Sequence, residues 1–116
     1  MSDKEIIEMA AKSIGYKIAW NSNWHNYQLL NPVPDRFGYF KHPWNPLEDN
    51  SDAMDIMVKL GMNVNVFLNR AEPFTEVRFQ HYGSETITEE AHMGDAAKAT
   101  RRAIVRSAAR IGKAMP

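Results

Sequence analysis

The chain has no cysteine among its 116 residues, which excludes disulfide bonds, thiolate zinc ligands and cysteine nucleophiles. It also has no run of about 18 apolar residues, the length that a membrane-spanning helix requires. Its first residues, 1–5, are polar and acidic, so we expect no secretory signal peptide. These absences favour the reducing cytosol, and we expect a cytoplasmic protein that does not contact a membrane.

Net charge is absent as well, because 14 Lys and Arg residues balance 14 Asp and Glu residues. A neutral chain is a poor general binder of nucleic acid, since phosphate contacts need an excess of positive charge. The balance hides an asymmetry: residues 95–116 hold six basic residues and one acidic residue, and the rest of the chain holds eight and thirteen. The basic tail and the acidic body could pair within the fold, pair between subunits or face different ligands.

Motifs of catalysis and metal binding are missing too. The glycines form neither a phosphate-binding loop nor a dinucleotide fingerprint, and no nucleophile elbow is present. No two histidines have the His-x-x-x-His spacing of a helical zinc site, and the acidic cluster at residues 48–55 lacks the glycine and final glutamate of an EF-hand. We therefore expect no enzyme activity, no metal and no cofactor.

What is present is a clear pattern of helices and strands. Apolar residues recurring every three or four positions predict helices over residues 3–14, 51–60 and 95–113. Residues suited to helix caps and stops mark the ends of these helices: Ser2, Gly15, Gly61 and Asp95. The strand patterns predict six strands: 16–20, 27–30, 38–41, 63–68, 75–82 and 85–89.

This order predicts a single α+β domain over residues 1–116, with helices flanking a mostly antiparallel sheet. We expect strands 27–30 and 38–41 to pair around a turn at residues 32–35. The expected helix positions of the core are Ile6, Met9, Ile56, Leu60, Ile104 and Ile111. They should pack on a sheet that carries Val64, Val66, Val77 and Phe79.

The stretch from Trp44 to Asp52 is the first candidate site, because it holds more polar groups than one helix start requires. A ligand could stack on Trp44 and hydrogen-bond to Asn45. The ligand-binding residues that this hypothesis names are His42, Trp44, Asn45, Asp49 and Asp52. The alternative is a structural entry turn, in which a side chain at residues 49–51 caps the second helix.

A row of basic residues on the last helix is the second candidate site. The row repeats every four residues and comprises Lys98, Arg102, Arg106 and Arg110. Residues 94–102 are similar to the last helix of double-stranded-RNA-binding domains, in which glycine and lysine precede an alanine-rich helix. A solvated outer face of the helix explains the same row without any nucleic acid.

Three segments together resemble a family of small bacteriophage and prophage proteins that have a phage α/β/α (ABA) sandwich domain. The segments are Ala10–Gly15, Trp44–Ala53 and Ala99–Arg106. The resemblance implies a phage origin, a bacterial host cytoplasm and helices flanking a sheet. It brings no established chemistry.

From the residues and the resemblance we expect a non-enzymatic binding or accessory protein. Its partner would be a small polar or nucleotide-like ligand or a host protein, and self-association is left open. The alternative is a nucleic-acid-binding accessory protein that uses the last helix.

Overall fold

A computed structural model of the chain describes residues 1–30, 43–81 and 83–116. Its elements follow in the order α1 (Asp3–Ser13), β1 (Ile18–Asn21), β2 (Asn26–Leu29), α2 (Asn50–Leu60), β3 (Asn63–Phe67), β4 (Phe74–His81), β5 (Ser84–Ala91) and α3 (Ala96–Ala114). The α+β class and the predicted order of helices and strands are confirmed. Among the described helices, none is long and apolar enough to cross a membrane.

Local capping explains where the helices begin. The Ser2 side chain accepts a hydrogen bond from the backbone N–H of Glu5 at 3.2 Å, at the start of α1. Asp95 caps α3 in the same way, with its carboxylate 3.0 Å from the N–H of Lys98. At the other end of α2, Gly61 takes a left-handed conformation (φ 66°) that glycine adopts without strain.

The strands divide between two antiparallel sheets. β1 and β2 form a hairpin in which Trp20 lies opposite Tyr27. β3, β4 and β5 form a meander in the order β3-β4-β5. In that larger sheet Val64 lies opposite Val77, which lies opposite Thr88. The predicted partner of strand 27–30, at residues 38–41, lies outside the described residues.

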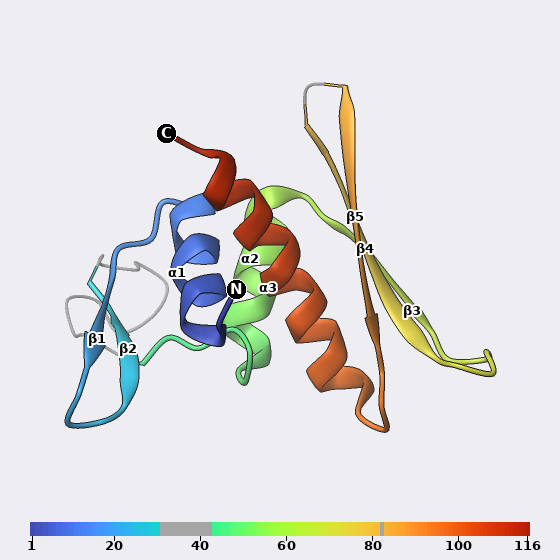
Figure 1. The fold of residues 1–116 in the computed structure, drawn as a ribbon, viewed down its shortest axis with the longest axis horizontal. Helices are drawn as coiled ribbons and strands as arrows, with labels where there is room; N and C mark the ends of the chain where they lie inside the picture. Colours follow the sequence, from blue (N-terminus) through green and yellow to red (C-terminus); the bar gives the residue numbers. More distant parts are fainter. Residues whose placement is uncertain (31–42, 82) are drawn as a thin grey trace.

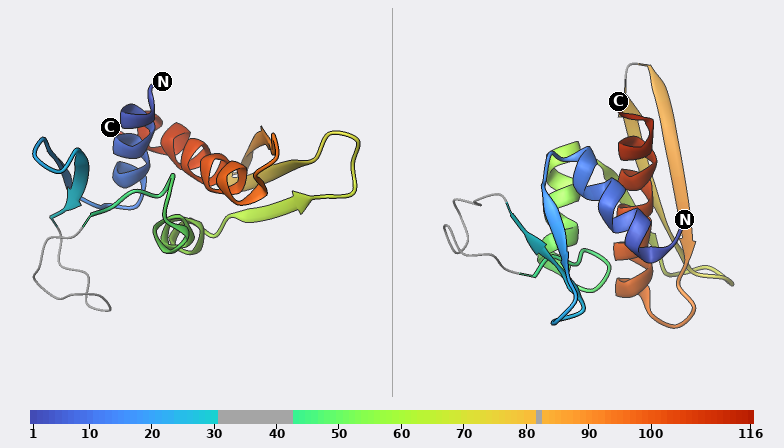
Figure 2. Two further views of the ribbon diagram at one scale, coloured as in Figure 1. Left: turned by 90° about the horizontal axis from the view of Figure 1, so that it is seen from below. Right: turned by 60° about the vertical axis from the view of Figure 1, so that its left-hand side comes forward.

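The helices lie between these two sheets, with α3 at the centre (Figures 1 and 2). α3 packs against α1 and α2, and also covers one face of the larger sheet. On the opposite face of that sheet, exposed side chains include Asn63, Asn65, Gln80 and Glu89. α3 is therefore the element that both halves of the molecule share.

The core forms where α1, α2, α3 and β4 meet. Five predicted core residues are buried: Ile6, Ile56, Val77, Phe79 and Ile104. Four others are partly buried at its margin: Met9, Leu60, Val64 and Ile111. Burial of Val66 was a wrong prediction, because its side chain is 46% exposed. β3 is an edge strand, so a neighbouring strand covers Val66 on one side only.

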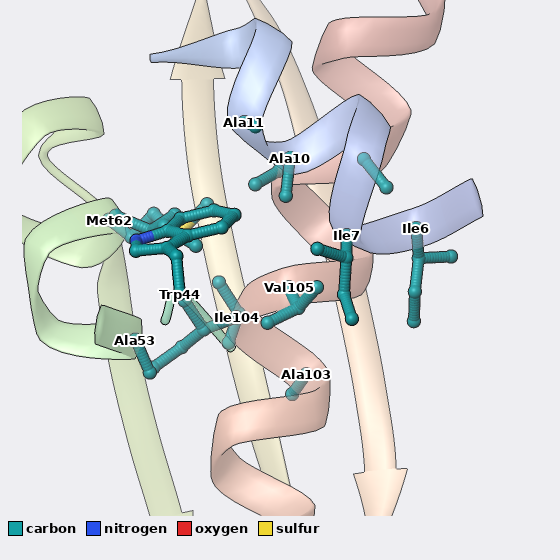
Figure 3. Packing of buried hydrophobic residues seen from close by; sticks show 14 of the residues in the cluster. Ile6, Ile7, Ala10, Ala11, Trp44, Ala53, Met62, Ala103, Ile104 and Val105 are labelled. Carbon is teal, nitrogen blue, oxygen red and sulfur yellow. The ribbon is translucent and has the colours of Figure 1, made fainter. Parts of the chain in front are cut away.

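The crossing of α1 and α3 is unusually close. Four alanines of these helices are completely buried, so small side chains bring the helices together: Ala10, Ala11, Ala108 and Ala109. Figure 3 shows Ala10 and Ala11 on α1 beside α3. At Gly112 an added Cβ atom would lie 1.9 Å from the carbonyl oxygen of Met9. Only glycine fits at that position of α3.

Candidate functional site

Three polar side chains of the Trp44–Asp52 stretch accept hydrogen bonds from backbone N–H groups of the same stretch: Asn45, Asp49 and Asp52. The Asn45 side-chain oxygen accepts from the N–H of Leu47 at 3.1 Å, which closes a local turn. The carbonyl of Asn45 accepts from the N–H groups of Glu48 and Asp49, at 3.1 and 2.9 Å. Asn45 therefore organises the entry to α2.

The two aspartates of the predicted site complete this turn. The Asp49 carboxylate accepts from the N–H of Asp52 at 3.0 Å and caps α2. Asp52 is only 3% exposed, and its carboxylate accepts from the N–H of Asn45 at 3.0 Å. This geometry supports the structural interpretation, because each group serves backbone N–H groups of the chain itself.

Trp44 is completely buried, with its ring in edge contact with Tyr16 at 5.7 Å between centroids. Figure 3 shows its indole among the side chains of the core. His42 lies outside the described residues, which end at residue 30 and resume at residue 43. Ligand binding by these five residues stays a prediction.

The basic row of α3 is engaged within the chain. Arg102 lies 3.0 Å from the carboxylate of Asp3 and 3.7 Å from that of Glu90. Arg106 forms an ion pair with Glu90 and also donates to the carbonyl of Glu89 at 3.3 Å. The basic tail thus pairs with the acidic body inside one molecule, which is one of the three arrangements that the sequence left open.

The first and last members of the row, Lys98 and Arg110, differ from the middle pair. Arg110 donates to the carbonyl of Ile87 at 3.0 Å and lies 3.4 Å from the hydroxyl of Thr88. Lys98 is exposed near the start of α3. Three of the four basic side chains therefore tie α3 to β5 or α1, and nucleic-acid binding by the row stays a prediction.

A groove of about 390 Å³ lies between α2, β3 and the first half of α3. Figure 2 shows these three elements from below, with α2 seen nearly end-on. The groove is lined by Asn50, Ala53, Met54, Met57, Val64, Val66, Ala96, Ala97, Thr100, Arg101 and Ile104. Its size and its mostly apolar wall with a few polar groups are typical of binding sites.

Arg101 gives this groove a positive charge. Its guanidinium donates to the carbonyl of Leu47 at 2.9 Å and to the side-chain oxygen of Asn50 at 2.8 Å. Both acceptors are neutral, and no ion pair joins Arg101 to a carboxylate within the described part of the chain. By contrast, Arg102 and Arg106 beside it are paired with acids. The groove therefore combines an apolar wall with an arginine that forms no ion pair among the described residues.

A buried polar chain fixes one wall of the groove. The Thr100 hydroxyl lies 2.8 Å from that of Thr75, which lies 2.8 Å from a ring nitrogen of His92. Thr75 is completely buried and His92 is 6% exposed. These bonds join the start of α3 to β4 and to the residue after β5, and so fix the position of Thr100 in the wall of the groove.

Exposed apolar side chains continue beyond the groove. Met54 on α2 is 56% exposed, Leu68 after β3 is 62% exposed and Met93 before α3 is 92% exposed. A second hollow of about 590 Å³ is lined by Leu68 and Met93 and shares Ala96 with the groove. The two hollows form one apolar surface across α2, β3 and the start of α3, which we call the apolar surface.

Among the described residues, no group of three His, Cys, Asp or Glu side chains is arranged to hold a metal ion. No family model matches the chain, and neither the curated proteins nor the solved structures contain a match to it. The resemblance to phage proteins consequently stays a prediction.

Proposed function

We propose that the chain is a non-enzymatic binding protein whose partner is another protein. A segment of that partner places apolar side chains in the groove between α2, β3 and α3, and a carboxylate on Arg101. The observation that carries this proposal is the position of Arg101, a cation held by neutral acceptors at the wall of an apolar groove. An acidic and apolar segment satisfies both features together.

The extent of the apolar surface favours a protein partner over a small polar or nucleotide-like ligand. Leu68 and Met93 lie outside the groove yet are more than half exposed. Continuous exposed apolar surface of this kind is characteristic of protein interaction sites. Met54 and Met57 add side chains that adapt their shape to a partner.

Peptide selection tests the proposal directly. A displayed library of random peptides is selected against the folded chain, and affinities of the selected peptides are measured by fluorescence anisotropy. We expect peptides with apolar residues three and four positions apart and with an Asp or Glu. Met54→Lys should weaken their binding by at least about tenfold, because it places a desolvated charge in the groove.

Two further variants separate the groove from the rest of the surface. Arg101→Gln should weaken the binding of acidic peptides more than the binding of the same peptides with Asn or Gln in place of the acidic residue. Gln80→Lys, on the far face of the sheet, adds the same charge as Met54→Lys and should leave affinity unchanged. Peptides that bind the Met54→Lys chain as tightly as the natural chain would exclude the groove as their site.

A further inference from the structure

The two edges of the larger sheet differ in how they are protected. β5 carries three glutamates, at positions 85, 89 and 90. Its main-chain carbonyls at Ile87 and Glu89 accept hydrogen bonds from Arg110 and Arg106 of α3. Charges and occupied carbonyl groups are the usual means by which proteins keep an edge strand from pairing with another chain.

β3 forms the other edge, and no charged residue belongs to the strand itself; the nearest charge along the chain is Arg70 of the following loop, which lies 5.1 Å from the centre of the Phe67 ring. Within the described residues it pairs on one side only, with β4. Residues 61–69 contain no charged residue and no proline. Val66, at the open edge, is 46% exposed. An uncharged edge strand beside exposed apolar side chains is a template for an added strand.

The sequence of β3 matches itself in the antiparallel direction. With Asn65 on a two-fold axis, Val64 of one copy lies opposite Val66 of the second copy, and both valines lie on the groove side of the sheet. Asn65 of one copy meets Asn65 of the other on the exposed outer face. Since Val64, Asn65 and Val66 are uncharged, these residues of two identical copies meet at the axis without repulsion.

We propose that the β3 edge pairs with the β3 edge of a second copy of this chain. The two three-stranded sheets then form one six-stranded antiparallel sheet, and the two apolar grooves lie next to each other across the axis. The interface is isologous, as in most dimers of identical chains. It involves one short strand and few side chains, so we expect a dissociation constant of about 10–100 µM, near the weak end of specific interfaces.

The test is the oligomeric state of the chain alone, which does not depend on any partner protein. Sedimentation equilibrium from about 10 µM to about 1 mM should show a monomer–dimer equilibrium. Asn65→Lys and Asn65→Glu each place like charges opposite one another on the axis, and each should weaken the dimer by at least about tenfold. An equal mixture of the two variants should recover a dimer, because opposite charges then meet.

Gln80→Lys is the matched control, because it adds one charge to the same outer face but on a strand that is not at the edge. It should sediment as the natural chain does. Three results would overturn the inference: a natural chain that is monomeric at 1 mM (about the upper limit of the measurement), a dimer that Asn65→Lys does not weaken, or a mixture of the two charged variants that does not associate.

Hydrogen exchange supplies a second readout. The outward-facing amides of β3 should exchange more slowly at high concentration than at low concentration in the natural chain. The Asn65→Lys chain should show no such dependence. Failure of the peptide selection leaves these results untouched, so the inference and the proposed function fail separately.

Discussion

The sequence predicts that Asn45 binds a ligand, whereas in the structure its side chain stabilises a turn of the backbone. The excess of polar residues before α2 predicts a site, yet in the structure Asn45 bonds backbone groups at residues 47–49. Sequence alone does not separate these outcomes, because amide and carboxylate side chains serve ligands and backbone N–H groups equally well. Which of the two roles applies depends on the position of Asp52. The burial of Asp52 follows from the tertiary fold, which the local sequence does not specify.

Asn45→Ala should therefore lower stability and leave peptide binding intact. Loss of the bond to Leu47 costs about 1 kcal/mol, the usual contribution of such a side-chain cap or turn bond. Urea denaturation measures the free energy of unfolding, and anisotropy with a groove-binding peptide measures affinity. Asn45→Asp is the matched control, since it keeps the accepting oxygen. Normal stability combined with lost binding would instead make Asn45 a contact residue.

Tyr27 gives a residue-scale prediction that depends on pH. Burial raises the pKa of the Tyr27 hydroxyl above its ordinary value of 10, and its hydrogen bond to Glu8 raises that pKa further. The unfolded chain then releases this proton at lower pH than the folded chain. The stability that Tyr27 contributes is complete below about pH 10 and is lost as pH rises toward the higher folded value.

Tyr27→Phe should remove that part of the pH dependence. For one proton, the free energy of unfolding falls by up to about 1.4 kcal/mol per pH unit above pH 10. Urea denaturation of both proteins at several pH values from 9 to about 11.5 measures the difference between their slopes. If the free energy of unfolding of both proteins changes with pH at the same slope over this range, Tyr27 has the same pKa in the folded chain as in the unfolded chain.

At the scale of elements, the helices were the most predictable part of the fold. Their ends are fixed by local chemistry, such as the Asp95 cap and the Gly61 stop, which adjacent residues specify. The division of the strands into two sheets was not predictable, because it depends on which elements α3 separates. The groove was missed for the same reason, since its wall comes from three elements. Arg101 is not part of the basic row of α3 that the sequence predicts as a candidate site.

Gly112→Ala tests the close crossing of α1 and α3. Helix propensity alone would make this change stabilising by up to about 1 kcal/mol. The new Cβ would overlap the backbone of Met9, which cannot move without shifting α1. We expect a net loss of about 1–3 kcal/mol, typical of overpacking, measured by urea denaturation.

Lys113→Ala is the control for that measurement. It lies next to Gly112 on the same helix but is exposed, so its effect should stay within about 0.5 kcal/mol. A Gly112→Ala chain that is more stable than the natural chain would mean that α1 and α3 separate easily at this crossing.

At the scale of the whole molecule, the two sheets are held to the helices to different extents. The larger sheet is bonded to α3 through Arg106, Arg110 and the Thr100–Thr75 contact. The β1–β2 hairpin has two four-residue strands, and its Trp20 and Trp24 are 41% and 75% exposed. A two-stranded ribbon is marginally stable and depends on packing against its neighbours.

Native-state hydrogen exchange should therefore find two levels of protection. Amides of α3 and β4 should exchange only through global unfolding, and those of β1 and β2 should open locally at lower free energy. The measurement is the denaturant dependence of exchange, followed by mass spectrometry or NMR. If amides of the hairpin and of α3 are equally protected from exchange, the molecule instead unfolds as one unit.

The unequal edges of the larger sheet also limit how far association can proceed. In the language of polymer chemistry, a subunit with two reactive ends grows into a chain, and one with a single reactive end stops at the pair. In the larger sheet the two ends correspond to the two edge strands. Arginines of α3 occupy carbonyl groups of one edge strand, β5, and the other edge strand is β3. If β3 pairs as proposed, the larger sheet is monofunctional in this sense. Association through that sheet then stops at a pair of chains and does not start a fibre.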